Sequence, residues 1–367
     1  MKTSFLKTGF LVCVFCLVGL TRLSGINKDS LQSKVLAKST IFNEIYSEPL
    51  KEITIITAID SILLNRKTNK SFPATLTFTD AKGKIREKSI KLKARGKSRR
   101  LYCSFPPLKI SFSGKELLAN GLRKQHRSLK LVTHCNDGLS ANRNVLKEFL
   151  AYKMYNELTE NSLRVQLLKV TYQDINSDYS MDKYAILLED IDELAERMDG
   201  KELEAFGKSI NEFDQSNANV FTLFQFMIGN ADWKIRTQSN VKFIQSNVNN
   251  VLTLVPYDFD SSGMVAPEYA RPFNSLGLNS MKQRLFMGQF TSKTARKETV
   301  SFFKDKRVNL YSLVKNFKLM DYATRNETKE YLDAFYQIIN TRMFLDKAVP
   351  VGKRVPETSD PDGAMSF

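Results

Sequence analysis

Two aspartates separated by a single residue follow an apolar run in the second half of the chain. They stand in LVPYDFDSSG, residues 254–263, where Asp258 and Asp260 flank Phe259. Mg²⁺ prefers hard oxygen ligands and needs only one or two carboxylates, because it keeps water and phosphate oxygens. The pair therefore predicts a magnesium site at the end of a strand. The alternative is a turn in which both aspartates accept hydrogen bonds from nearby backbone N–H groups.

A second polar segment, GNADWKIRTQSN at 229–240, precedes this pair. Asn240 lies eight residues after Asp232 (240 − 232), and Asp258 lies 26 residues after Asp232 (258 − 232). A loop Asp, an Asn, a hairpin and a further Asp follow one another in this order in kinase-type phosphoryl transfer. There one Asp orients the attacking hydroxyl, while the Asn and the second Asp hold Mg²⁺ against the nucleotide phosphates. Turn formation by the same residue types competes with this interpretation.

Composition limits the function classes. The chain has 367 residues, is 42% hydrophobic and carries a formal charge of +16, so it can form a large core and can bind anions. No nucleic-acid motif accompanies the charge, and we expect no nucleic-acid partner. With only two histidines, a histidine-rich zinc site is excluded by count. No G-x-S-x-G segment supports a serine triad.

The first 25 residues have the pattern of a signal peptide. Lys2 and Lys7 precede an apolar run of twelve residues, 9–20, which is too short for a membrane span. We therefore expect an exported protein without a transmembrane span. The large residues before Cys13 and Cys16 argue against a lipoprotein. Removal of the signal leaves Cys103 and Cys135, for which we predict a disulfide, with two buried free thiols as the alternative.

Hydrophobic periodicity predicts sheet first and helix later. A strand pair at 240–245 and 251–257 interrupts the helical part, and Ser140 is a plausible N-cap for the helix at 144–158. The other predicted strands are 53–57, 74–79, 88–95, 107–112, 128–133, 164–172 and 183–189. The other predicted helices are 190–198, 201–207, 216–229, 279–287, 310–318 and 327–346.

This order predicts two lobes. A signal peptide (1–25) and a lead-in (26–50) come first, then a sheet-rich lobe at 51–189 and a mainly helical lobe at 190–349. The residues 350–367 are rich in proline and glycine and are expected to be disordered.

Several segments resemble the CotH family of spore-coat-type atypical kinases. They are KARGKSRR (93–100), residues 142–172, YAILLEDID (184–192) and the two carboxylate segments, which together cover roughly residues 90–265. The resemblance implies an α+β, two-lobed protein-kinase-like fold. Its N-terminal lobe would be an antiparallel sheet plus one helix, and its C-terminal lobe mainly helical with a short hairpin. It also implies ATP and Mg²⁺ (or Mn²⁺) as cofactors and a protein acceptor, which the sequence does not identify.

The resemblance assigns a role to each matching residue. Asp232 would be the catalytic-loop Asp, Asn240, Asp258 and Asp260 would serve the metal, and Glu189 would lie near the hinge. Arg95 and Ser98 would approach the phosphates, and Lys109 would pair with Glu148. Glu148 can equally be an ordinary charge on a helix face. The chain lacks the adjacent lysines that often follow the family's Arg-Gly-x-Ser segment. It also lacks a G-x-G-x-x-G loop, so the seven basic residues of 88–100 would have to contact the phosphates.

Three functions remain open from the sequence. The first is an exported kinase that transfers the γ-phosphoryl group of Mg-ATP to a protein Ser or Thr hydroxyl. The second is a non-catalytic envelope or surface interaction protein, which the scarcity of ATP outside the cytoplasm favours. The third is a metal-dependent phosphoester hydrolase that uses Asp232, Asp258 and Asp260.

Overall fold

The computed structural model describes residues 39–47, 50–80, 82–96, 98–138, 140–346 and 365–366. Residues Ser39–Phe367 form one compact unit. The predicted signal peptide, most of the lead-in and nearly all of the predicted tail lie outside the described residues.

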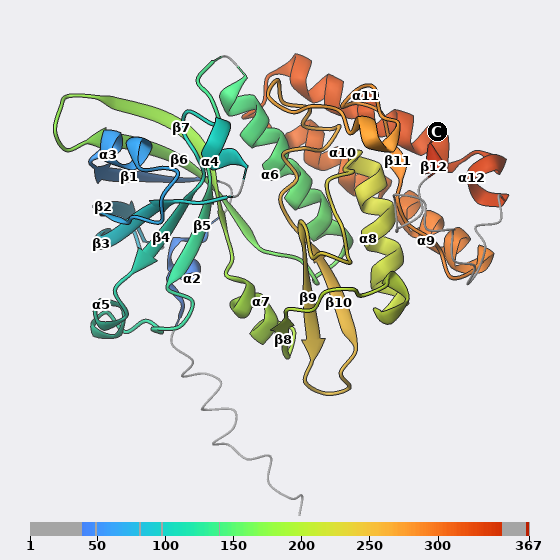
Figure 1. The fold of residues 1–367 in the computed structure, drawn as a ribbon, viewed down its shortest axis with the longest axis horizontal. Helices are drawn as coiled ribbons and strands as arrows, with labels where there is room; N and C mark the ends of the chain where they lie inside the picture. The colour runs from blue at the N-terminus through green and yellow to red at the C-terminus, as the bar shows by residue number, and fades with distance from the viewer. Residues whose placement is uncertain are drawn as a thin grey trace, which may run out of the picture. The chain divides into compact units, whose positions relative to one another are not determined.

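Seven strands close into a barrel in the first half of this unit (Figure 1). Neighbouring strands pair antiparallel except at one place, where β1 runs parallel to β6 with Lys51 opposite Leu168 and Thr57 opposite Asp174. In spatial order the strands are β1 (Lys51–Thr57), β2 (Phe72–Thr79), β3 (Ile85–Ala94), β4 (Leu108–Phe112), β5 (Ser128–Val132), β7 (Ser180–Leu188) and β6 (Val165–Asp174).

Apolar side chains at alternating positions of the strands fill the interior of the barrel. In β2, and in β3 from Lys88 onward, every second residue is buried, because successive side chains of a strand point to opposite faces. Ile55, Leu76, Leu92 and Leu129 are fully buried in one cluster, to which the short helices beside the barrel contribute Phe42. Those helices are α2 (Ile41–Ile45), α3 (Ile59–Leu64), α4 (Arg99–Tyr102) and α5 (Gly114–Ala119).

The predicted fold class, a two-lobed protein-kinase-like fold with an N-terminal antiparallel sheet, is wrong. The parallel pairing of β1 with β6 closes that sheet into a barrel. The hairpin of the helical part belongs to a three-stranded sheet of β8 (Gly200–Leu203), β9 (Val241–Ser246) and β10 (Leu252–Pro256). Alternation identifies the buried face of a strand but not its neighbour. Pairing between strands more than 100 residues apart therefore left no local signal.

Helices form most of the second half. In Figure 1 the long helix α6 (Ala141–Leu158) lies between the barrel and these helices. One core cluster joins α6 and the ends of β6 and β7 to the later helices through Phe149, Phe224 and Phe335. The later helices are α7 (Ile191–Arg197), α8 (Gln215–Ile228), α9 (Lys293–Asp305), α10 (Arg307–Asn316), α11 (Tyr322–Ile339), α12 (Arg342–Asp346) and the 3₁₀ turns η1 (Ile210–Glu212) and η2 (Asn274–Leu276).

Two predicted helices are wrong. Residues 201–207 contain strand β8, and 279–287 contain turns and the short strand β11 (Leu285–Phe286), which pairs with β12 (Met365–Ser366). None of the helices in the described part of the chain is both long and apolar enough to cross a membrane.

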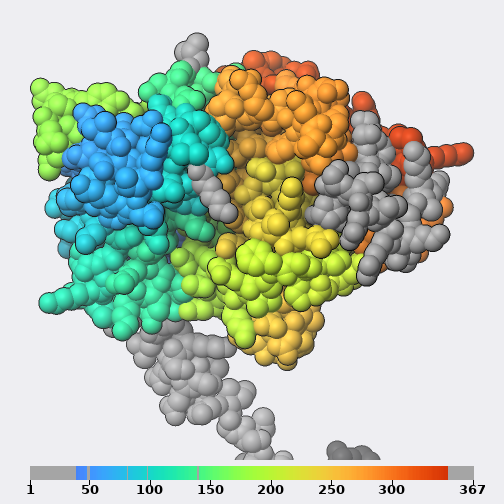
Figure 2. All heavy atoms as spheres, in the orientation of Figure 1, coloured from blue at the N-terminus to red at the C-terminus, as the bar shows by residue number. Residues whose placement is uncertain are grey.

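The barrel side and the helical side meet directly. On the face drawn in Figure 2, the cyan residues around 100 lie against the orange residues beyond 260. The rings of Tyr102 and Tyr269 stand 5.8 Å apart at this boundary. Segments that the sequence separates by more than 150 residues therefore meet here.

Candidate functional site

Backbone hydrogen bonds hold the two carboxylate segments against each other. The N–H of Gly263 donates to the carbonyl of Gly229 (2.9 Å), and the N–H of Met264 donates to that of Ile228 (3.0 Å). Gly229 ends helix α8 with a φ of 64°, which favours glycine. A Cβ atom at either glycine would overlap the hydroxyl of Tyr331. Glycine at both positions therefore allows the two segments to touch.

The hairpin of β9 and β10 connects these segments and fixes their ends. The N–H of Tyr257 donates to the carbonyl of Asn240 (3.1 Å) directly before Asp258. Asn240 and Asp258 have positive φ values of 54° and 65°, which Asn and Asp tolerate better than most residues. The amide of Asn240 donates to the backbone carbonyl of Asp232 (2.5 Å). Asn240 therefore ties the loop of Asp232 to the hairpin, and its predicted metal role remains a prediction.

Phe259 anchors the Asp-x-Asp segment in the core. Its ring is fully buried and lies 4.5 Å from that of Tyr152 and 5.4 Å from that of Phe224. The Tyr152 hydroxyl accepts a hydrogen bond from the backbone N–H of Asp258 (2.8 Å). The aromatic residue between the two aspartates thus fixes where their carboxylates lie.

The aspartates repel one another at a partly buried site, where Asp260 is buried and Asp232 and Asp258 are half-buried. Burial, and then the Asp260 carboxylate, raise the pKa of Asp258 to about 6. Arg99 and Arg95 act on this pKa in the opposite direction. Burial and the Asp260 carboxylate also raise the pKa of Asp232. Raised values of this kind arise where like charges share a site, and such sites attract protons or cations.

The two members of the Asp-x-Asp pair differ in their partners. Asp260 accepts hydrogen bonds from Ser261 Oγ and Tyr269 Oη, both at 3.2 Å. Its Oδ2 also lies 3.5 Å from Nη1 of Arg99. Among the described residues, no side chain donates a hydrogen bond to the carboxylate of Asp258. Asp258 therefore has its oxygens available for a ligand, while Asp260 is occupied within the protein.

Helix α6 adds Glu148 to the site. This residue is only 2% exposed. Burial, and then the Asp260 carboxylate, raise its pKa well above the ordinary value, and Arg99 opposes them. Oε1 of Glu148 has no hydrogen-bond partner, which is costly for a buried carboxyl oxygen. Within the described chain the cation beside Glu148 is Arg99, so the predicted pair of Lys109 with Glu148 is not formed.

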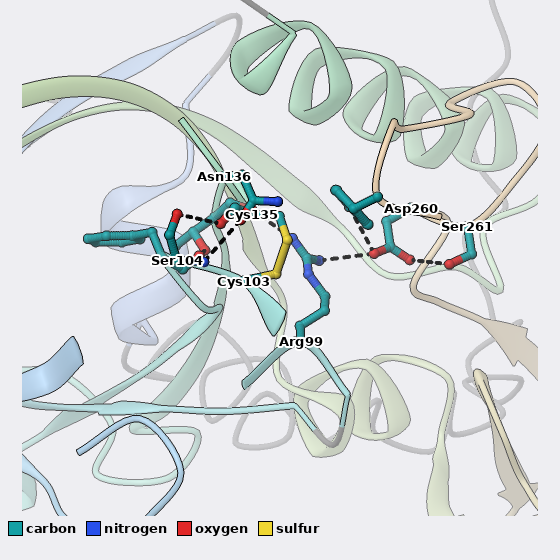
Figure 3. Close-up of a disulfide and its surroundings, with 10 residues drawn as sticks. Arg99, Cys103, Ser104, Cys135, Asn136, Asp260 and Ser261 are labelled. Carbon is teal, nitrogen blue, oxygen red and sulfur yellow. Dashed lines mark hydrogen bonds and ion pairs between the residues drawn. A yellow bond between two sulfur atoms is a disulfide. The ribbon is translucent and has the colours of Figure 1, made fainter. Parts of the chain in front are cut away.

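A disulfide fixes Arg99 beside these carboxylates. Cys103 follows α4 and is bonded to Cys135 after β5, which confirms the predicted pairing. Figure 3 shows the Arg99 side chain next to this bond with its guanidinium directed at Asp260. Nη2 of Arg99 donates to the carbonyl of Thr133 (2.8 Å). The disulfide is compatible with an exported protein.

Lysines from three barrel strands stand opposite one another in register. Lys93 is paired with Lys109, and Lys109 with Lys130. Burial, and then cations of which Arg95 is the strongest, lower the pKa of Lys130 to about 8. Its ammonium lies 5.6 Å from the centre of the Tyr257 ring. These contacts connect Lys130, rather than Lys109, to the end of the hairpin that carries the aspartates.

Two further predicted residues lie apart from this cluster. Ser98 is exposed and caps α4 by position without a side-chain hydrogen bond. Glu189 is 2% exposed and is held by Arg164 (2.8 Å) and Arg197 (3.0 Å). Both of its oxygens are used in these bonds. Through these ion pairs with Arg164 and Arg197, Glu189 fixes the segment between β7 and α7.

Sequence reasoning did not single out four members of the site, which are Arg99 (considered only among the basic residues of 88–100), Lys130, Tyr152 and Tyr269. Lys130 occupies a polar position in an alternating strand, and Tyr152 lies in the stripe of a helix, so both look ordinary. Arg99 stands four residues before Cys103 (103 − 99). This spacing could have identified Arg99, because a disulfide at Cys103 also restricts the position of a residue one helical turn before it.

The donor set fits a hard divalent cation. Asp258, Asp260, Asp232 and Glu148 offer only oxygen atoms, as Mg²⁺ and Mn²⁺ prefer. Within the described residues, no group of three or more His, Cys, Asp or Glu side chains could by itself hold a metal ion. Mg²⁺ is commonly held by one or two carboxylates together with water and substrate phosphates. The residues present are compatible with that mode.

Comparisons with known proteins add little to this geometry. No family model and no curated protein matches the chain. The crystal structure of the proinflammatory kinase CtkA from Helicobacter pylori aligns with a TM-score of 0.32 and 12% sequence identity. The alignment covers 57% of this chain and 86% of that chain. The likeness to a kinase is weak, and the resemblance to the CotH family remains a prediction.

Proposed function

We propose that the chain is an exported phosphotransferase that moves the terminal phosphoryl group of ATP to a Ser or Thr hydroxyl of a protein. One observation carries the proposal. The loops of Asp232 and Asp258 are hydrogen-bonded to each other, the carboxyl groups of both residues have raised pKa values, and the barrel-side cations Arg99 and Arg95 act on Asp258. Phosphoryl transfer depends mainly on positioning and charge neutralisation, and this arrangement provides both.

The surroundings of each aspartate favour a different role in the reaction. Asp258, whose carboxylate accepts no hydrogen bond from a described side chain, would be the main ligand of Mg²⁺ or Mn²⁺, which neutralises charge on the nucleotide phosphates when bound. Asp260 would be a secondary ligand, through the lone pairs that its protein partners leave unused. Asp232 would orient the acceptor hydroxyl and accept its proton. A raised pKa suits that role, because a general base works best with a pKa close to the operating pH.

The barrel cations would bind the phosphates. Arg95 acts on the carboxyl of Asp258, and the ammonium of Lys130 lies over the ring of Tyr257, the residue before Asp258. Arg99 would hold Asp260 and Glu148 in place rather than contact the nucleotide, because its guanidinium is already bonded to Asp260 and Thr133.

The proposal is tested with the chain from residue 26, labelled ATP, Mg²⁺ or Mn²⁺, and a mixture of acceptor proteins. We expect label to appear on protein, and Asp232→Asn to reduce transfer by about 10²-fold or more, the usual contribution of a general base. Nucleotide binding should remain, because the substitution keeps the size of the side chain. The exposed Asp305 provides the matched control, Asp305→Asn, which should transfer like the wild type.

Two results would contradict this assignment in different ways. Release of inorganic phosphate without labelled protein would favour a metal-dependent hydrolase over a transferase. Failure of the wild type to bind nucleotide with either metal would identify a non-catalytic interaction protein.

A further inference from the structure

A groove of about 860 Å³ lies on helices α10 and α11, away from the carboxylate site. It is formed by the solvent side of α10, the connection after it and the first half of α11, which are neighbours in Figure 1. Leu310 of α10 and Leu332 of α11 point into the core instead. The groove therefore lies on the surface of two helices whose opposite faces pack into the core.

Exposed apolar side chains line this groove. Val308 is 73% exposed and Tyr322 is 76% exposed, and both belong to the lining together with Tyr311. Single exposed apolar residues are common, but a concave group of them marks a binding surface.

The charge of the lining is strongly positive. Five cations and one carboxylate surround the groove, a balance of +4 (5 − 1). The carboxylate, Asp333, is already engaged by Lys329 at 2.7 Å and by Arg307 at 3.5 Å. The other three cations are Lys315, Lys318 and Arg325.

Those three cations have no carboxylate partner among the described residues. Lys318 Nζ donates to the backbone carbonyl of Lys315, and Arg325 donates to that of Met320. Backbone carbonyls leave the positive charge uncompensated, so an anionic partner would gain attraction at each of these positions.

We infer that this groove binds an acidic, amphipathic segment of a partner protein. The apolar lining fits the hydrophobic face of such a segment, and the surrounding cations match its carboxylates. A concave surface fits a peptide better than the flat face of a membrane. The inference does not depend on the proposed catalytic activity, because it concerns binding at a separate surface.

The experiment uses fluorescence anisotropy with the full chain from residue 26. The probe is a short fluorescein-labelled peptide in which Leu and Glu form opposite faces of a helix, and its twin carries Gln at every Glu. We expect the Glu peptide alone to bind, with affinity that falls as salt is raised. Lys315→Glu with Lys318→Glu should weaken binding on the order of tenfold or more. Tyr322→Ser should also weaken it.

Matched controls lie in exposed turns far from the groove. Lys82→Glu with Lys84→Glu carries the same charge change, and Val248→Ser removes a side chain that is 79% exposed. Neither should alter binding. Equal binding of the two peptides, or equal loss in groove and control variants, would overturn the inference. Binding to anionic lipid vesicles that requires Lys315 and Lys318, without peptide binding, would assign the surface to membranes and would also overturn it.

Discussion

At the scale of single residues, the ionised carboxyl of Asp258 destabilises the folded protein when no ligand is bound. Burial and the neighbouring Asp260 raise its pKa to about 6, above the unfolded value near 4. Such a group stabilises the fold fully only below the unfolded pKa, and this contribution is lost as pH rises through 6. The residue is therefore retained at the expense of stability, as is common for residues at functional sites.

Replacing Asp258 by Asn should consequently stabilise the metal-free protein at pH 7.5. The expected gain in unfolding free energy is on the order of 1–3 kcal/mol. It should vanish near pH 3, below the unfolded pKa of about 4, where the wild-type carboxyl is largely protonated in both states. Denaturant unfolding of both proteins in chelator at the two pH values measures this difference. A loss of stability at pH 7.5 would mean that the carboxylate makes favourable contacts in the folded state.

The sequence predicted which carboxylates lie together where chemistry and spacing coincided, while their catalytic and metal roles stay predictions. Asp232, Asp258 and Asp260 were expected together, and the structure brings them together. The sequence placed Lys109 beside Glu148, whereas the described cation that acts on Glu148 is Arg99, and the two cations are only ten residues apart in the sequence (109 − 99). The position of α4 and its disulfide make Arg99 the neighbour of Glu148, and the local hydrophobic periodicity of the sequence reveals neither feature.

At the scale of elements, two glycines control how closely the carboxylate loops approach. An Ala at position 229 must adopt a φ of 64° and also displace the hydroxyl of Tyr331. We expect Gly229→Ala to destabilise the protein by about 2–4 kcal/mol, because strain and overpacking add. Gly83→Ala provides the control, since its φ is 76° but no atom lies within 4 Å of the new Cβ. It should cost only about 1 kcal/mol.

A second substitution separates the two causes in Gly229→Ala. Tyr331→Phe removes the hydroxyl, which has no hydrogen-bond partner, and should restore part of the lost stability. Thermal unfolding of the single and double variants gives the interaction energy. If Tyr331→Phe has the same effect in both backgrounds, crowding at this contact is not the cause.

The disulfide should act on the site through Arg99. Reduction, or Cys103→Ser with Cys135→Ser, opens a loop of 32 residues and should cost about 3–4 kcal/mol in chain-entropy models. It should also weaken nucleotide binding, because α4 would no longer hold Arg99 against Asp260. In Arg99→Gln, reduction should leave the remaining nucleotide affinity unchanged. Additive effects of reduction and Arg99→Gln would show that the disulfide acts by another route.

Element boundaries were predicted well where one local signal dominated. The seven barrel strands and α8 match the predicted ranges within a few residues. Strand β8 was misread because Lys, Glu and Leu favour helix. Pairing with β9 and the contact of Glu202 with Lys242 (2.5 Å) overrode that preference.

At the scale of the whole molecule, the site exists only when the barrel and the helical part are both folded. Arg95, Arg99 and Lys130 come from the barrel side, while Asp232, Asp258 and Asp260 come from beyond α8. The closure of the barrel was not predictable, because strands β1 and β6 join residues far apart in the sequence. A ligand that binds this site should therefore stabilise the entire unit rather than one part.

Mg-ATP should raise the melting temperature of the chain in a single transition. A ligand that binds only the folded state contributes about 2.7 kcal/mol at one hundred times its dissociation constant. For a unit of this size, an unfolding entropy of about 2 cal/mol/K per residue converts that energy to roughly 4 °C. ATP with chelator should give a much smaller shift, and Asp258→Asn should lose the metal-dependent part although it is more stable without ligand. Asp305→Asn should retain the full shift. A wild-type protein whose melting temperature does not respond to saturating Mg-ATP or Mn-ATP would contradict a nucleotide site at these carboxylates.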